Sequence, residues 1–518
     1  MKSALRFLPA VLILSSGSAA QPPAPAATPS IPRFTDPARR EKVTALLPQI
    51  DREFAAFAEK KEIPGLVWGI VLDGELVHTG ALGFANVEKK IPATADTRFR
   101  IASMSKSFTA LAIMKLRDAG KLSLHDPVTR FLPEFRHVAP LTTDAPATTV
   151  RHLLTMTPGF PEDNPWGDRQ LAIGAKDFAA FLSAGVAMSN STGVTFEYSN
   201  FAYALLGQII ARVTGESYQT YITREILRPL GMKDTVWEFA NVPADKLALG
   251  YRAAGPGRWQ LEPLLHDGVY GAMGGLLTTV RDFARYVSFH LSAWPARNDP
   301  DNGIVRRASL REMHQAAVFT GLNASAKNRA GETVPTVNGY GFGLSSTRDS
   351  NGITRIGHGG GLPGFGSFWR FYPEHGIAVI SFANLTYAGT GAVNAAAESI
   401  LIEEARLPRR ALPPSAILAT RTKQVAQLIQ SWDAGLADAI VAENFFPDRP
   451  RDAWMALARE TLAKAGSIKS VGEIVPENQL RGTFALNGEL GRVDVYFTLT
   501  PEQVPRVQQL RLTFVARP

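Results

Sequence analysis

The stretch that decides the fold is Arg100-Ile-Ala-Ser-Met-Ser-Lys-Ser-Phe-Thr109, in which Ser103 and Lys106 stand three positions apart. Side chains at positions i and i+3 lie on one face of a helix, so the serine hydroxyl and the lysine amine would be neighbours. Apolar residues then recur at helical spacing as far as Gly120. We therefore predict that Ser103 lies at the start of a buried helix, where backbone N–H groups favour a developing negative charge.

A serine hydroxyl is a poor nucleophile until another group takes its proton, and a lysine can do so when burial lowers its pKa. A Ser-x-x-Lys pattern alone is weak evidence, because a serine near a helix cap followed by an exposed lysine gives the same letters. The segment Glu197-Tyr-Ser-Asn200 offers further partners. Tyr198 could shuttle the proton as a phenolate stabilised by a nearby ammonium, and Asn200 could hydrogen-bond Lys106. The alternatives are a core tyrosine and a helix N-cap.

A third segment, His358-Gly-Gly-Gly361, places three glycines on a predicted strand. Glycines on a strand allow another chain to approach closely. A substrate lying along this strand would pair with it, and a strand N–H could complete an oxyanion hole with the N–H of Ser103. The alternative is a glycine-rich bulge beside an exposed histidine.

These segments occur in an order that resembles the serine β-lactamase and penicillin-binding-protein superfamily, closest to its class C-like branch of esterases and D-amino-acid peptidases. The resemblance covers roughly residues 40–405. The phrases that carry it are Phe99-Arg-Ile-Ala-Ser-Met-Ser-Lys106, Leu153-Leu-Thr-Met-Thr-Pro-Gly159, Tyr198-Ser-Asn200, Gly274-Gly-Leu-Leu-Thr-Thr-Val-Arg-Asp-Phe-Ala-Arg285 and Gly357-His-Gly-Gly-Gly-Leu-Pro-Gly-Phe-Gly366.

The resemblance implies a role for each matching position. Ser103 would be the acylated nucleophile, and Lys106 and Tyr198 would share general base and acid duty. Asn200 would support the lysine ammonium and contact the substrate. The strand residues that would line the substrate site are His358, Gly359 and Gly361, the last supplying an oxyanion-hole N–H together with Ser103.

Two departures from the family pattern bear on the substrate. β-Lactamases and transpeptidases carry Lys-Thr-Gly on the strand, whereas this chain has His358-Gly-Gly360 and lacks a fixed cation and a hydroxyl there. We expect His358 to be only partly charged near neutral pH. A class A type Glu-x-x-Leu-Asn loop is also missing. The sequence therefore predicts a serine hydrolase with a Ser103 acyl-enzyme that acts on esters or D-amino-acid amides and peptides, with weak or no β-lactamase activity.

The rival interpretation is a non-catalytic, penicillin-binding-like sensor or binding protein for cell-wall fragments. In either case the expected partner is a small ester or amide, or a cell-wall peptide. The nine histidines show no His-Glu-x-x-His spacing and the chain has no cysteine, so we expect no metal and no cofactor.

The order of predicted elements indicates an α+β fold. Leu66–Leu72 and Leu76–Leu82 flank an Asp-Gly turn and predict an antiparallel hairpin. Residues from Leu122 to about Gly275 are mainly helical with long loops, and strands return near Gly341. This order predicts an antiparallel sheet flanked by helices, with an all-helical insert. Three strand candidates of the last part are 354–361, 366–372 and 377–382.

Two local signals make sharper predictions. Thr279-x-x-Asp282 is a candidate capping box for a helix that runs to about Leu291. Beyond the first fold, alternating apolar residues around 493–499 predict strands, and Asn487-Gly488 predicts the hairpin turn before them. These strands, with two preceding helical patterns, indicate a small C-terminal α+β domain of unknown role.

The domain organisation follows from these patterns. A proline-rich stretch precedes the main fold, and a second one separates it from the C-terminal domain. The predicted parts are a signal peptide 1–20, a spacer 21–37, a serine hydrolase domain 38–406, a linker 407–414 and the C-terminal domain 415–518.

The N-terminus predicts export. Lys2 and Arg6 precede the apolar run Phe7–Leu14, and small residues end at Ala20. We expect cleavage after Ala20, a secreted or periplasmic protein, and no stable membrane anchor afterwards, because the apolar run is too short to span a bilayer. The alternative is an uncleaved anchor. The net charge of +8 comes from scattered basic residues, so we expect no nucleic-acid partner.

Overall fold

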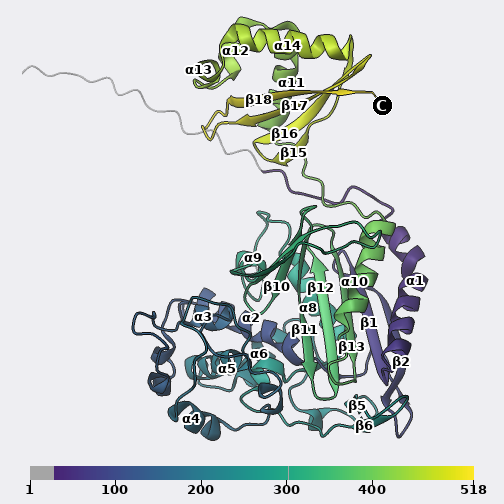
Figure 1. Cartoon of the computed structure of the whole chain (residues 1–518), viewed down its shortest axis with the longest axis vertical. Coiled ribbons are helices and arrows are strands. Elements are labelled where there is room, and N and C mark those ends of the chain that lie inside the picture. The colour runs from purple at the N-terminus through teal and green to yellow at the C-terminus, as the bar shows by residue number, and fades with distance from the viewer. Residues whose placement is uncertain (1–28, 302, 518) are drawn as a thin grey trace, which may run out of the picture. The chain divides into compact units, whose positions relative to one another are not determined.

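The computed structural model describes residues 29–301 and 303–517. They form two compact units, Arg33–Ala411 and a smaller unit of Leu412–Pro518 with the residues before Arg33 (Figure 1). The predicted signal peptide 1–20, its cleavage site and residues 21–28 of the spacer lie outside the described residues. Within the described part, no helix combines the length and the apolar character needed to cross a membrane.

The larger unit is built on a nine-stranded antiparallel sheet with the order β3-β2-β1-β13-β12-β11-β10-β9-β8. The predicted hairpin forms its first part, with Asp73 and Gly74 at positive φ in the turn between β1 and β2. The strands are β1 (Gly65–Leu72), β2 (Glu75–Asn86), β3 (Ile91–Pro92), β8 (Val318–Asn323), β9 (Thr336–Tyr340), β10 (Ser345–Asp349), β11 (Thr354–Leu362), β12 (Phe365–Tyr372) and β13 (Ile377–Ala383).

Two neighbouring inner strands, β1 and β13, are buried at every position, so helices must cover both faces of the sheet there. On one face, Trp68 and Ile70 of β1 pack in a cluster with α1 and α10. On the other, Val67 and Val71 pack in the main core, which includes α2 and α8 (Figure 1). The alternation along β1 therefore fixes one strand between two hydrophobic cores.

The helical insert leaves the sheet region at a short strand, β4 (Phe99–Arg100), and returns at β7 (Leu277–Thr278), which pairs with it. Within the insert a small ladder of β5 (Tyr251–Ala253) and β6 (Trp259–Leu261) adds to the helices. The α-helices of the larger unit are α1 (Arg39–Lys60), α2 (Ser105–Asp118), α3 (Val150–Leu154), α4 (Ala175–Ser183), α5 (Asn200–Thr214), α6 (Tyr218–Ile222), α7 (Gly271–Gly274), α8 (Val280–Ser292), α9 (Arg307–His314) and α10 (Gly391–Ser399).

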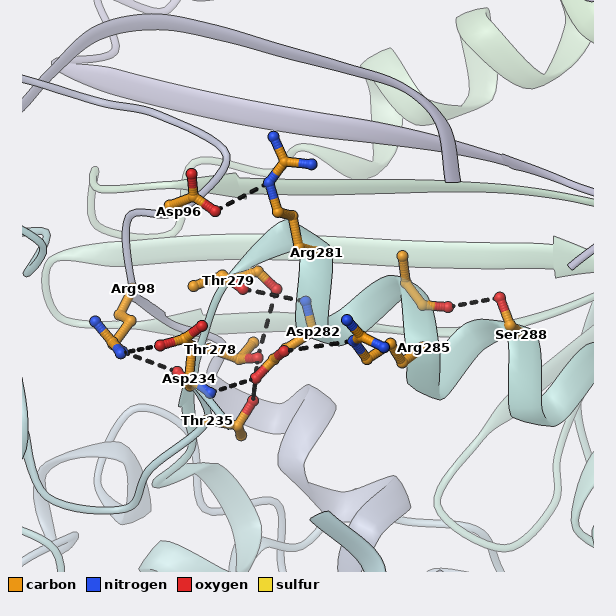
Figure 2. A network of polar contacts seen from close by, with 11 residues as sticks. Asp96, Arg98, Asp234, Thr235, Thr278, Thr279, Arg281, Asp282, Arg285 and Ser288 are labelled. Atoms are coloured by element: carbon orange, nitrogen blue, oxygen red, sulfur yellow. Dashed lines mark hydrogen bonds and ion pairs between the residues drawn. The ribbon is translucent and has the colours of Figure 1, made fainter. Parts of the chain in front are cut away.

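The predicted capping box at the start of α8 forms only in part. Thr279 caps the helix by accepting a hydrogen bond from the N–H of Asp282 (3.1 Å). The Asp282 carboxylate does not return to the cap. It accepts instead from the N–H of Asp234 (2.7 Å) and the hydroxyl of Thr235 (3.0 Å) (Figure 2). Only half of the predicted capping box forms, because Asp282 fastens the Asp234 segment of the insert to α8.

The smaller unit packs helices against a five-stranded antiparallel sheet, with β16 central between β14 and β17 and also paired with β15. Val493, Val495 and Phe497 of β17 are buried and alternate with partly exposed neighbours, as predicted. Its elements are α11 (Ala416–Ser431), α12 (Ala434–Ile440), α13 (Phe445–Asp448), α14 (Arg451–Ala465), β14 (Ile468–Val471), β15 (Val475–Asn478), β16 (Arg481–Gly488), β17 (Gly491–Leu499) and β18 (Val507–Ala516).

The predicted turn in this unit was wrong. Asn487 and Gly488 belong to strand β16, and the hairpin turn falls at Glu489 and Leu490. A Cβ on Gly488 would lie 2.2 Å from the carbonyl oxygen of Ala465 at the end of α14. The glycine therefore permits a close approach of helix and strand rather than a turn.

Candidate active site

Ser103 lies at the point where the chain turns from β4 into α2. A single 3-10 turn, η1 (Ala102–Met104), precedes the helix, and the N–H of Ile101 donates to Leu276 O (3.0 Å) to hold the approach. Ala102 has φ +49°, a left-handed conformation that costs a residue with a Cβ on the order of 1–2 kcal/mol. Such strain persists only where the surroundings impose it, and functional sites are where it concentrates. Ser103 itself is 7% exposed.

Lys106 is fully buried beside it. The Nζ atom donates to Ser103 Oγ (2.9 Å), to Asn200 Oδ1 (2.7 Å) and to the carbonyl oxygen of Met273 (3.2 Å). Burial lowers the pKa of Lys106 to about 7. A large fraction of the amine is then neutral near pH 7, and a neutral amine can accept the serine proton. The structure thus brings the predicted nucleophile and its base into hydrogen-bond contact.

Two carboxylates lie near the lysine, that of Asp168 buried and that of Asp163 half-buried. Asp168 and Asp163 act to raise the pKa of Lys106 against the effect of burial, and burial raises their own pKa values. Asp163 also accepts from the N–H groups of Asn200 (2.7 Å) and Phe201 (2.9 Å) at the start of α5. Neither aspartate could be predicted from the sequence, because Asp163 lies in a loop and Asp168 in a short 3-10 turn, η4 (Gly167–Arg169), with no apolar periodicity to orient them.

Asn200 is held in one orientation. Its Oδ1 accepts from Lys106, while its Nδ2 donates to Asn164 Oδ1 (2.7 Å) and Asp168 Oδ1 (3.4 Å). The alternative role as a helix cap is wrong, because Ser199 is the N-cap of α5 and accepts from Ala202 N. Asn200 therefore supports the lysine, as the sequence predicted.

Tyr198 lies next to the pair, with its ring centroid 4.8 Å from Lys106 Nζ. Burial raises the pKa of Tyr198 well above its ordinary value, and the interaction with the Ser103 hydroxyl opposes this only in part. Burial thus disfavours the phenolate in this geometry, and the role of Tyr198 as a proton shuttle stays a prediction. The phenol keeps its proton and suits the role of proton donor, which a general acid requires.

His358 lies on β11, close to Tyr198, with 6.2 Å between the two ring centroids. It is 6% exposed, and Nε2 hydrogen-bonds the hydroxyl of Tyr340 (3.1 Å). Burial, with the charge of Lys106 acting in the same direction, lowers the pKa of His358 to about 4. The expected partial charge is therefore wrong, because the imidazole is neutral at pH 7, and the alternative of an exposed histidine is wrong as well.

One edge of β11 is open beside this histidine. β11 pairs with β12 as far as Leu362↔Phe365 but with β10 only as far as Gly357↔Ser345. Since Leu362 and Phe365 flank a two-residue turn, they form a hydrogen-bonded pair and alternate residues face the other way. The N–H groups of Gly359 and Gly361 therefore point to the open edge. There a carbonyl oxygen of the substrate backbone or of the acyl group can accept a hydrogen bond from them.

The glycine between them explains how the strand and Ser103 come together. A Cβ on Gly360 would lie 2.3 Å from the carbonyl oxygen of Ile101 and 2.3 Å from Ser367 Oγ. Ser367 donates to that same carbonyl oxygen (2.8 Å). Only glycine lets β11 touch the segment that carries the nucleophile, so the predicted close approach is made to the protein's own backbone.

All seven residues singled out from the sequence thus lie on three segments that converge on Ser103. The family model described as Beta-lactamase matches residues 50–402, which include each of them. The chain belongs to the β-lactamase family. As a member of this family it is a serine hydrolase-like protein, and the match spans the larger unit almost from end to end.

Two kinds of relatives agree with this assignment. Protein flp of Staphylococcus aureus (strain NCTC 8325 / PS 47) is 30% identical over 340 residues, which are 65% of this chain and 63% of that protein. The chain thus matches less than two thirds of the length of this curated relative.

Solved structures show the same fold. An octameric penicillin-binding protein homologue from Pyrococcus abyssi aligns with a TM-score of 0.59 at 22% identity, over 90% of this chain and 95% of that chain. A class C β-lactamase aligns with a TM-score of 0.54 at 21% identity, over 71% of this chain and 98% of that chain.

The pKa of Lys106 leads to a prediction about pH. If the neutral amine is the base, kcat/KM for p-nitrophenyl acetate should rise with pH and level off above about pH 7, because kcat/KM reports the free enzyme. Asp168 favours the charged amine, so Asp168→Asn should lower the pKa of Lys106 and move the acid limb to lower pH, by about 0.5–1 unit. Rates measured between about pH 5 and pH 9 for both proteins check this. A limb that moves to higher pH would contradict it.

Proposed function

We propose that this protein is an exported hydrolase that forms an acyl-enzyme on Ser103 and cleaves esters or D-amino-acid amides and peptides. The observation that carries the proposal is the contact of a buried lysine of lowered pKa with the serine hydroxyl. Lys106 would take the proton as Ser103 attacks the acyl carbon, and the N–H groups of Ser103 and Gly361 would receive the oxyanion. Tyr198 would return a proton to the leaving group.

The strand side of the site favours esters and amides over β-lactams. A substrate carboxylate is best held by a fixed cation, but His358 is neutral, with its Nε2 paired to Tyr340. Gly359 and Gly360 follow it and add no hydroxyl. Substrates without an obligatory carboxylate therefore fit this edge better, and weak or no β-lactamase activity follows.

The test is a substrate ranking on the purified full chain. We expect kcat/KM for p-nitrophenyl acetate or a D-alanine p-nitroanilide to exceed that for a chromogenic cephalosporin by about tenfold or more, since one missing charged hydrogen bond is worth that much. The opposite ranking would contradict the proposed substrate class. A single stoichiometric release of product without turnover would instead favour the binding-protein alternative.

Export and the surroundings of the substrate belong to the same proposal. The basic residues Lys2 and Arg6 ahead of the apolar run Phe7–Leu14 support a secreted or periplasmic location. In that location the substrate would be a small-molecule ester, an amide or a cell-wall peptide.

A further inference from the structure

Tyr387 is a tyrosine that the proposed chemistry leaves unused, and it lies directly beside the oxyanion-hole strand. It follows β13, and its ring packs against Gly361 so closely that a Cβ on this glycine would lie 2.6 Å from Tyr387 Cδ1. Yet the residue as a whole is 47% exposed. One side of the ring therefore covers Gly361 while the other faces solvent.

The loop that carries Tyr387 is fixed to the sheet. The N–H of Tyr387 donates to Phe365 O (3.1 Å), and that of Thr386 to Tyr251 O (2.8 Å). A Cβ on Gly366 would lie 2.6 Å from the backbone nitrogen of Ala388, which shows how closely the loop lies on β12. Tyr387 has φ +50°, a strained value that these contacts impose. The ring is thus a fixed wall and not part of a mobile lid.

The hydroxyl of Tyr387 ties this wall to the helical side of the site. It donates to Asp168 Oδ2 (2.8 Å), and Asp168 Oδ1 accepts from Asn200, which in turn accepts from Lys106. Asp168 is 1% exposed. Tyr387 therefore spans the distance between the strand that carries Gly361 and the segments that hold the base, within the larger unit.

We propose that Tyr387 is a specificity-determining residue that restricts substrates to short, unbranched acyl groups. This inference rests on the proposed function, because the N–H of Gly361 would hold the acyl carbonyl oxygen. An oxygen bound there lies about 3 Å from that nitrogen, so the acyl chain begins beside the ring. The ring, held against Gly361 on one face and through its hydroxyl by Asp168, occupies the space into which a longer or branched chain would extend.

The experiment compares p-nitrophenyl acetate with p-nitrophenyl octanoate on three proteins. The wild type should prefer acetate. Tyr387→Gly removes the ring and suits the positive φ, so it should fold at least as well. It should raise the octanoate-to-acetate ratio of kcat/KM about tenfold or more, the usual effect of freeing space for a few methylenes. Tyr387→Phe keeps the ring and loses only the bond to Asp168, so its ratio should stay within about threefold of the wild type. An unchanged ratio in Tyr387→Gly, or the same change in Tyr387→Phe, would overturn the inference.

A covalent probe separates this inference from the proposed function. In p-nitrophenyl ethyl methylphosphonate and its octylphosphonate counterpart, Ser103 Oγ would attack phosphorus, p-nitrophenolate would leave, and Lys106 would take the serine proton. Intact mass then reports one adduct on Ser103 without any need for turnover. If both probes and both esters fail to react with the wild type, the two proposals fail together. If the methyl probe reacts but Tyr387→Gly leaves the methyl-to-octyl ratio of labelling rates unchanged, only the role of Tyr387 fails.

Discussion

Ser103→Ala should lower kcat/KM for p-nitrophenyl acetate by at least about 10³-fold, because loss of the nucleophile from a catalytic serine site removes the acyl-enzyme route altogether. The residual rate would come from binding and from the N–H groups of Gly361 and residue 103, which the substitution keeps. The fold should survive, since the change removes one oxygen that contacts Lys106. Ester turnover and the mass of trapped adducts, measured on the same preparations, check the prediction.

Ser107→Ala is the matched control. Ser107 is buried in the same helix, and its hydroxyl donates to the carbonyl oxygen of Met104 (2.9 Å), away from the lysine. Its loss should leave ester turnover within a few-fold of the wild type, with a modest fall in unfolding temperature. If Ser103→Ala keeps more than about a tenth of the activity, another residue carries the reaction.

The fold could be read from the sequence wherever local chemistry is periodic. The Asp73-Gly74 turn and the apolar runs beside it predicted the hairpin, and the helix that carries Lys106 ends just before Gly120, which takes a left-handed conformation as expected. The predicted turn at Asn487-Gly488 was wrong because Gly488 instead allows a close contact between a helix and a strand. A dipeptide reports backbone freedom, and only the tertiary structure shows which use is made of it.

The candidate site was predictable where the family pattern names residue types, and not where burial sets the charge. Ser103, Lys106 and Asn200 could be placed from their motifs and meet as expected. The neutral state of His358 could not, because its pKa depends on burial and on the amine of Lys106. Met273 lies in the short helix α7, Asp168 in a short 3-10 turn and Tyr387 in a loop, and each reaches the site through single polar contacts for which no sequence pattern exists.

The two aspartates near Lys106 explain how this lysine can be buried and still act as a base near neutral pH. Desolvation alone favours the neutral amine, whereas Asp168 and Asp163 favour the ammonium. A base works best when its pKa lies near the working pH. The opposing effects leave the pKa of Lys106 at about 7. The same nitrogen can therefore take the serine proton and later release it.

Lys106→Met should therefore lower kcat/KM for p-nitrophenyl acetate by about 10²–10⁴-fold, the range over which a positioned general base contributes. Methionine fills similar space without a proton-accepting nitrogen, so Ser103 keeps its place and loses its base. The activity that remains should no longer show the acid limb near pH 7, because the titrating amine is gone. Loss of the amine leaves Asn200 Oδ1 and the carbonyl oxygen of Met273 without their donor, so the unfolding temperature should also fall, by several degrees.

Lys115→Met tests whether the effect belongs to the site rather than to the helix. Lys115 lies on the same helix, α2, and its amine contacts Ile304 O (3.0 Å) and the Glu225 carboxylate (3.2 Å) at the surface. Partly exposed ion pairs contribute little, so this variant should keep ester turnover within about twofold and the acid limb unchanged. Equal losses in the two variants would mean that α2 tolerates no such change and that Lys106 has no special role. A Lys106→Met protein that is nearly as active as the wild type and keeps its acid limb would assign the base to another group.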